Sequence, residues 1–321
     1  MSNQQTVAEF GEFALIAEIS KRLNSDNSAE HFAKVILGSG DDSAVTSSPD
    51  SPTVSCVDLL VEGVHFRTDW STATEIGRKA VAANLADIFA MGAQPEHLLV
   101  ALAISPETKV EWVLELADGI RQEAEKVGAV VVGGDLSKSA QIVISVTAVG
   151  RLQASNPITR SGAKAGDVLA IAGRLGYSQA GLMMLSRGFR SPRSIVSLHR
   201  APEPAYELAR QALSAHSMID ISDGLVSDLG HIAEQSQVAI NIDSSLLEIP
   251  QDLQDLASAF TADAMQWLLH GGEDHAFAAT FANGEVPARW QVIGSVTSGY
   301  GVLVDGEEVE PRGWNHFSSG K

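Results

Sequence analysis

The sequence predicts a two-domain protein of the α/β (α+β) class, with an N-terminal α/β domain and a C-terminal α/β domain packed beside it. Its 321 residues exceed the length of one ordinary domain and suit two. Hydrophobic residues make up 45% of the chain and charged residues 19%, so there is enough apolar material for real cores. Strand-like and helix-like segments alternate along the first half, and a second alternation follows a polar stretch at residues 153–167.

The first half contains segments with the composition of strands and others with the periodicity of helices. Val81, Leu85 and Ile88 recur at spacings of four and three, which gives one apolar stripe on a helix that Gly92 ends. We expect strands at residues 53–60, 98–104, 129–132 and 142–149, and helices at residues 74–91 and 110–127.

The polar stretch at residues 153–167 carries Pro, Gly and Ser, and we place the domain boundary there. The predicted domains are therefore residues 1–152 and residues 153–321. In the second half we expect strands at residues 168–172, 238–242, 276–281 and 290–296, and helices at residues 178–186, 203–215 and 225–235.

Composition excludes several classes of function. A formal net charge of −18 argues against binding to nucleic acid or to anionic membranes, since both need Lys and Arg. The single cysteine, Cys56, excludes an internal disulfide and a cysteine-based zinc cluster. No basic stretch precedes the apolar residues near the N-terminus, and no apolar run approaches the ~18 residues that span a bilayer. We expect a cytoplasmic protein.

Carboxylates gather in glycine-bearing turns and at predicted strand ends, which is the most informative feature of the sequence. Magnesium takes oxygen ligands, whereas zinc prefers His and Cys, so this pattern favours magnesium and phosphate chemistry. Each turn taken alone is more typical of an ordinary turn or helix cap than of a metal site. Asp87 lies one helical turn after Asn84, on a face away from the Val81 stripe. The other acidic positions are Asp41, Asp42, Asp58, Asp135, Asp220, Asp223, Glu273 and Asp274.

The usual nucleotide-binding signatures are absent from the sequence. There is no G-x-x-x-x-G-K-[ST], the segment GSGDDS departs from G-x-G-x-x-G at its last position, and the protein-kinase motifs are missing. If ATP binds, its phosphates must be held by metals and backbone amides. Ser222 or Asp223 could cap the helix that follows and turn its N-terminal amides toward a phosphate; the alternative is an ordinary cap.

An ordered series of motifs resembles the thiamine-monophosphate kinase family. The series runs from Gly11 to Phe317 as GEFALIAEI, GSGDDSAV, VDLLVEGVHF, KAVAANLADIFAMGAQP, GGDLSKS, TRSGAKAGD, IDISDGLVSDLGHIAE, GGEDH and GWNHF. Short pieces such as GGD recur in the wider superfamily of aminoimidazole ribonucleotide synthetase, selenophosphate synthetase and a hydrogenase maturation protein. EGVHF, NLADIFAMGA, SDGLVSDLGHI and GWNHF together are far more specific.

The resemblance implies transfer of the γ-phosphoryl group of ATP to thiamine monophosphate, the last step of thiamine diphosphate biosynthesis. It implies a homodimer whose N-terminal domains bind ATP and metal and form a barrel-like interface, while the C-terminal domain completes the site. The implied magnesium ligands are Asp42, Asp58, Asp87, Asp135, Asp220 and Asp223. The implied ATP contacts are Gly134, Asp135, Arg160 and Ser222, and the implied substrate contacts are His65, Glu273 and Trp314.

Physical reasoning agrees with this assignment. Donor and acceptor are both phosphates, so several Mg²⁺ ions would offset their repulsion and align the reacting atoms. No general base is needed, because a phosphate monoester is already largely ionised near neutral pH. Arg160 could donate two hydrogen bonds to the triphosphate, and Trp314 offers an aromatic face to a cationic thiazolium.

The sequence departs from the family pattern at a few positions. Cys56 and Val57 stand where the family has serine and threonine, which removes a hydroxyl ligand, and His275 stands where a tyrosine is usual. Lys138 replaces a common arginine. Selenophosphate synthetase would need a reactive cysteine or selenocysteine near the N-terminus, but none precedes Cys56. The hydrogenase maturation protein would need a C-terminal cysteine, which this sequence lacks. A relative that only binds nucleotide is the alternative from another class.

Overall fold

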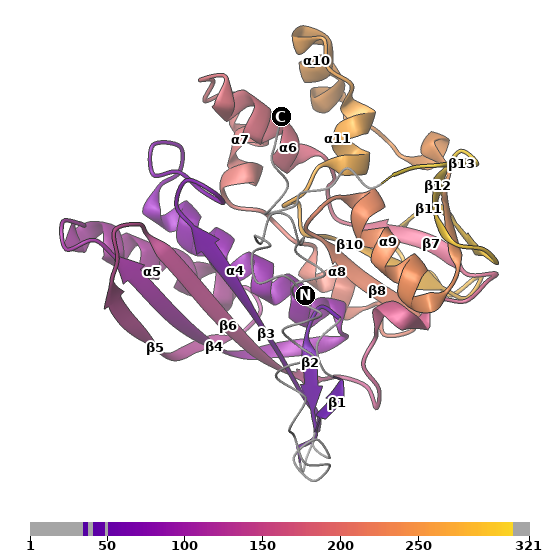
Figure 1. Ribbon diagram of the computed structural model, residues 1–321, viewed down its shortest axis with the longest axis horizontal. Helices are drawn as coiled ribbons and strands as arrows, with labels where there is room; N and C mark the ends of the chain where they lie inside the picture. Colours follow the sequence, from indigo (N-terminus) through magenta and orange to yellow (C-terminus); the bar gives the residue numbers. More distant parts are fainter. Residues whose placement is uncertain (1–34, 38–40, 49–50, 311–321) are drawn as a thin grey trace, which may run out of the picture.

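The computed structural model contains two mixed β-sheets with helices packed on and between them (Figure 1). It describes residues 35–37, 41–48 and 51–310. Trp314 and the GWNHF segment lie outside the described residues, as does the GEFALIAEI segment. The prediction of a two-domain α/β fold is confirmed.

The sheet of the first half joins six strands in the order β1-β2-β3-β6-β4-β5 within the described part of the chain. Strands β4 and β5 pair in parallel, and the other neighbours pair antiparallel. The predicted strands are all present, and β5 runs six residues beyond the predicted end through the glycines of GGDLSK. The strands are β1 (Val35–Leu37), β2 (Ala44–Thr46), β3 (Thr53–Val61), β4 (Ala93–Ile104), β5 (Val130–Lys138) and β6 (Val143–Leu152).

Two helices, α4 (Ala73–Ala90) and α5 (Val110–Glu125), pack against each other beside this sheet. Helix α4 begins with a capping box in which Thr72 and Glu75 exchange side chain–backbone hydrogen bonds. The helices approach so closely that a Cβ at Gly77 would lie 2.3 Å from the Leu116 carbonyl oxygen. The predicted stripe on α4 is fully buried, but most of the remaining surface is buried too, because α4 lies between the sheet and the second half of the chain.

The sheet of the second half has the order β13-β12-β9-β11-β7-β10-β8 within the described part. Strands β12 and β9 pair in parallel and the rest antiparallel. The predicted strands at residues 168–172, 238–242, 276–281 and 290–296 are present. The strands are β7 (Val168–Ala172), β8 (Ser217–Ile221), β9 (Ala239–Ile242), β10 (Ala276–Phe281), β11 (Gln291–Thr297), β12 (Gly301–Val304) and β13 (Glu307–Glu308).

Six α-helices accompany this sheet within the described residues. The predicted helix at residues 203–215 is wrong in length, since only α8 (Tyr206–Arg210) is helical and turns follow. The predicted helices at residues 178–186 and 225–235 correspond to α6 (Tyr177–Ser186) and α9 (Leu225–Ser236). The helices α7 (Arg193–Arg200), α10 (Gln251–Phe260) and α11 (Ala264–His270) were not predicted.

The two halves share a hydrophobic core. Phe277 and Phe281, on one face of the second sheet, belong to the same buried cluster as Phe89 of α4. The other face of that sheet packs against α6, α9, α10 and α11 in a second cluster that includes Ile219 and Leu229. No helix of the described residues is long and apolar enough to cross a membrane.

Candidate active site

A cavity of about 580 Å³ opens between the two halves of the chain. Strand β3 and helix α4 provide one wall, and the end of β8, helices α6 and α11 and the turn at residues 271–275 provide the other. Seven of the sequence-predicted site residues line it, which brings side chains from positions far apart in the sequence to one place. They are Asp58, His65, Asp87, Asp220, Ser222, Asp223 and Glu273.

Three carboxylates converge at one end of this cavity. Asp42, Asp87 and Asp220 each offer an oxygen, and the three oxygens lie within 4.8 Å of one another. Asp42 lies just before β2, Asp87 on α4 and Asp220 near the end of the fully buried strand β8. Asp58 on β3 lies near this group, and its backbone N–H donates to Asn84 Oδ1 at 3.1 Å.

The electrostatics of this group favour a bound cation. Burial, together with the charges of Asp220 and Asp41, raises the pKa of Asp42 to about 8 even though Arg160 opposes the shift. Burial and the three neighbouring aspartates raise the pKa of Asp87 well above its ordinary value. The Oδ2 atom of Asp42 is buried and has no hydrogen-bond partner among the described residues. Buried carboxylates with raised pKa values and an unsatisfied oxygen are what a hard divalent cation would satisfy.

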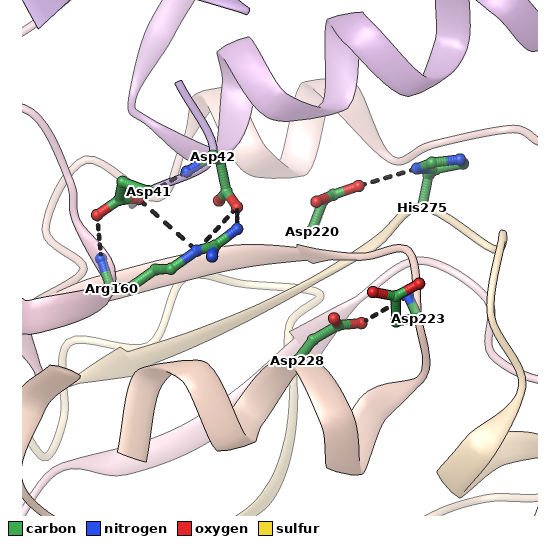
Figure 2. A network of polar contacts seen from close by, with 7 residues as sticks. All are labelled: Asp41, Asp42, Arg160, Asp220, Asp223, Asp228 and His275. Atoms are coloured by element: carbon green, nitrogen blue, oxygen red, sulfur yellow. Dashed lines mark hydrogen bonds and ion pairs between the residues drawn. The ribbon is translucent and has the colours of Figure 1, made fainter. Parts of the chain in front are cut away.

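Arg160 contacts the two aspartates of GSGDDS in different ways (Figure 2). Its Nε donates to Asp42 Oδ1 at 3.0 Å, and its guanidinium makes a second, shorter contact with the same oxygen. Its backbone N–H donates to Asp41 Oδ2 at 2.9 Å. Asp42 therefore belongs to the carboxylate group, while Asp41 fixes the backbone at Arg160.

His275 occupies the position next to Asp220 (Figure 2), with its Nδ1 2.8 Å from Asp220 Oδ2. Burial alone would lower the pKa of His275, but the hydrogen bond and the charges of Asp220 and Asp58 outweigh it and raise that pKa. The backbone at Glu273 and His275 has positive φ angles of 62° and 50°, so the GGEDH turn holds its side chains in an uncommon conformation.

The start of helix α9 differs from the expectation that Ser222 or Asp223 caps it. Gly224 occupies the N-cap position with φ 119°, and no side chain caps the helix there. Asp228 in the first turn reaches back instead and accepts the N–H groups of Asp223 and Gly224 at 3.1 and 3.0 Å (Figure 2 draws Asp223 and Asp228). These two amides are therefore directed at an internal carboxylate.

The other end of the cavity contains an ion pair that was not predicted from the sequence. Lys79 Nζ lies 3.0 Å from Glu273 Oε1, and the Lys79 side chain is 3% exposed. Lys79, Ala83 and Asp87 all line the cavity and are spaced four residues apart on α4. That spacing is the signal that could have identified Lys79 from the sequence. Ser178, which also lines the cavity, was missed as well.

Within a single chain, Gly134 and Asp135 lie away from this cavity. Both are on the edge strand β5, where Asp135 accepts a hydrogen bond from Ser137 Oγ at 3.0 Å. Through the strand register Asp135 is level with Leu59, whose side chain points to the sheet face opposite that of Asp58. Gly134 approaches Val100 so closely that no Cβ fits there. Neither residue lines the cavity.

Two family models match the chain. Residues 40–152 match the N-terminal domain of AIR synthase related proteins, and residues 164–305 match the C-terminal domain. The two-sheet fold and the acidic cavity between its halves thus define an AIR synthase related protein.

Relatives that match nearly the full length of the chain identify one family within this class. The thiamine-monophosphate kinase of Mycobacterium tuberculosis is 44% identical over 97% of this chain and 93% of its own length. That of Aquifex aeolicus is 34% identical over 96% and 99%. A solved structure, "AaThiL complexed with AMPPCP and TMP", superposes with a TM-score of 0.89 at 32% identity, covering 98% of this chain and 100% of that one. The chain belongs to the thiamine-monophosphate kinase family.

Proposed function

We propose that this protein transfers the γ-phosphoryl group of ATP to the phosphate of thiamine monophosphate and releases thiamine diphosphate and ADP. The observation that carries the proposal is the convergence of Asp42, Asp87 and Asp220 at one end of a cavity whose other end holds His65 and Glu273. A phosphate-transfer site needs cationic neutralisation at one end and recognition of the organic acceptor at the other. The relatives named above support the choice of acceptor, and AMPPCP is an analogue of ATP.

Mg²⁺ ions would be held by Asp42, Asp58, Asp87, Asp220 and Asp223. When bound, they neutralise the phosphates and stabilise the charge that develops during transfer. Asp42 pairs with Arg160 through Oδ1, while its buried Oδ2 has no partner among the described residues and is the oxygen that a cation could take. For Arg160 to donate to the triphosphate, as predicted from the sequence, its guanidinium would have to leave Asp42.

The cavity supplies positioning and no general base. Ser222 follows the last residue of β8 and lines the cavity together with Asp220 and Asp223, and it would contact the nucleotide. His65 and Glu273 would orient the acceptor, and Trp314 would add an aromatic face. Catalysis then consists of alignment and charge neutralisation.

We infer that two copies of the chain form the working unit, through the N-terminal domain at residues 1–152. Large apolar side chains are exposed on one face of its sheet, including Val57 (62%), Leu59 (51%) and Leu99 (45%). Such a surface is typical of a subunit interface. Asp135 is on the Leu59 side of the sheet, so a second copy packed there could place Gly134 and Asp135 near a nucleotide. Residues 153–321 would complete each site, and the use of ATP suits a cytoplasmic enzyme.

The test is product formation by the purified protein with ATP, Mg²⁺ and thiamine monophosphate, run beside an EDTA control and an Asp87→Asn variant. We expect thiamine diphosphate and ADP in equal amounts, only with metal and only in the wild type. ATP turnover with a different acceptor would move the substrate assignment to a sister family. Absence of any ATP turnover would refute the proposal and favour a protein that only binds nucleotide.

A further inference from the structure

Lys79 connects three separate segments around the acceptor end of the cavity. Its ammonium group donates to the carbonyl oxygen of His65 at 3.0 Å, and to that of His199 at 3.3 Å. Its third partner is Glu273 Oε1 at 3.0 Å. An ammonium group has three N–H bonds. All of them are therefore accounted for by protein acceptors, and Lys79 has no donor left for a phosphate.

Glu273 depends on Lys79 for its charge. Burial would raise the pKa of Glu273, but the charge of Lys79, followed by that of His199, lowers it below its ordinary value. His199 Nδ1 is 3.6 Å from Glu273 Oε2 and 3.0 Å from Ser178 Oγ. Because burial lowers the pKa of His199 to about 4, this imidazole is neutral near pH 7. Lys79 is then the cation bonded to Glu273 under working conditions.

The position of Lys79 on α4 also defines a direction along the cavity. Lys79 and Asp87 are eight residues apart on one helix, a separation of ~12 Å along its axis. The carboxylate group is at the Asp87 end and Glu273 is at the Lys79 end. The side chain of Glu273 is 32% exposed and lines the cavity, while its Oε1 forms the ion pair with the buried Lys79.

We propose that Lys79 is a positioning residue that holds Glu273 in place for recognition of the cationic organic part of the acceptor. This inference rests on the proposed function. It assigns the acceptor's phosphate to the Asp87 end and its positively charged rings to the Glu273 end. Lys79 acts through Glu273 and does not touch the reacting phosphates.

The test compares Lys79→Met with Arg78→Met. Methionine keeps the length of the side chain and removes the ammonium group. Arg78 is the matched control, because it directly precedes Lys79 on α4 but does not line the cavity. Its Nε forms an ion pair with the buried Glu123 at 3.1 Å. For each variant we would measure kcat, the KM for each substrate, and the Kd for thiamine monophosphate by calorimetry.

We expect Lys79→Met to raise the Kd and KM for thiamine monophosphate by about 10- to 100-fold. This is the loss of affinity typical of removing a residue that orients a binding side chain without touching the bound group itself. The KM for ATP should stay within about threefold of the wild type, since binding of the acceptor alone is weakened. Arg78→Met should leave both constants near the wild type. Equal losses for both substrates, or a fall in kcat with the acceptor KM unchanged, would overturn the proposal.

A double variant keeps the test decisive if Lys79→Met, which leaves the carboxylate of Glu273 without its ion-pair partner, fails to fold. Lys79→Met combined with Glu273→Gln removes both charges of the pair. If Lys79 acts through Glu273, the double variant binds thiamine monophosphate no more weakly than Glu273→Gln alone. Additive losses would refute the inference. Wild-type turnover, measured first, tests the proposed function separately, whereas only comparison among variants tests Lys79.

Discussion

Replacing Asp87 by asparagine should stabilise the metal-free protein and remove its response to Mg²⁺. The substitution keeps the shape of the side chain and removes one charge from a group whose oxygens lie within 4.8 Å of one another. Asparagine cannot ionise, so the repulsion from Asp42, Asp58 and Asp220 that raises the pKa of Asp87 disappears. The metal-free site loses an unfavourable charge and the metal-bound site loses a ligand.

The expected magnitude follows from the spacing. Two ionised carboxylates 4.8 Å apart repel by about 3.5 kcal/mol at an effective dielectric constant of ~20. Taking up a proton at pH 7 instead costs about 4 kcal/mol for a carboxyl of ordinary pKa. Both routes carry a free-energy cost, so we expect the free energy of unfolding to rise by roughly 2–4 kcal/mol, equivalent to a Tm increase of roughly 3–6 °C for a chain of 321 residues.

The assay is thermal unfolding in EDTA and again in excess Mg²⁺. Saturating metal should stabilise the wild type, by about 2.7 kcal/mol at one hundred times its Kd, and leave Asp87→Asn unchanged. Asp118→Asn is the control, because Asp118 is exposed on α5 and pairs only weakly with Arg121 at 3.4 Å. An Asp87→Asn protein that is less stable than the wild type in EDTA, or equally stabilised by Mg²⁺, would refute the reasoning.

Three further outcomes are expected. The pKa of His199 is lowered to about 4, so its folded form resists protonation and its contribution to stability is lost as pH falls from about 6.5 toward 4. Urea unfolding should therefore show the wild type losing about 2 kcal/mol relative to His199→Gln between pH 7 and pH 5; parallel curves would contradict this. Trp314→Ala should raise the KM for thiamine monophosphate more than that for ATP, and equal effects on both would remove its assigned role. Phe277→Ala should cost about 3–5 kcal/mol in urea unfolding, because its ring is fully buried where the two halves meet, and a loss below 1 kcal/mol would argue against that shared core.

Regular apolar runs could be predicted from the sequence, whereas short or mixed elements could not. Strand β10 is an unbroken buried segment and was placed correctly. Strand β8 was missed because its pattern is interrupted by Asp220, a buried charge that pairs with His275. Helix α11 has seven residues, too few for a periodic pattern to stand out.

The sequence indicated which side chains belong to the site but not what they contact. Arg160 was expected to serve a nucleotide, and only the tertiary structure shows it bonded to Asp42. Lys79 was overlooked because a lysine in a helix is usually solvated at its surface. Its burial depends on α4 being covered from both sides, which no local pattern on α4 can reveal.

The core shared by the two halves limits how this molecule can move. Phe89 from the first half and Phe277 and Phe281 from the second are packed in one cluster, so a hinge rotation that separated the halves would expose all three rings. Opening and closing of the cavity must therefore come from movement of individual side chains or surface segments. The same continuity predicts one cooperative unfolding transition instead of two, with amide hydrogens of β3 and β10 exchanging at the same global rate.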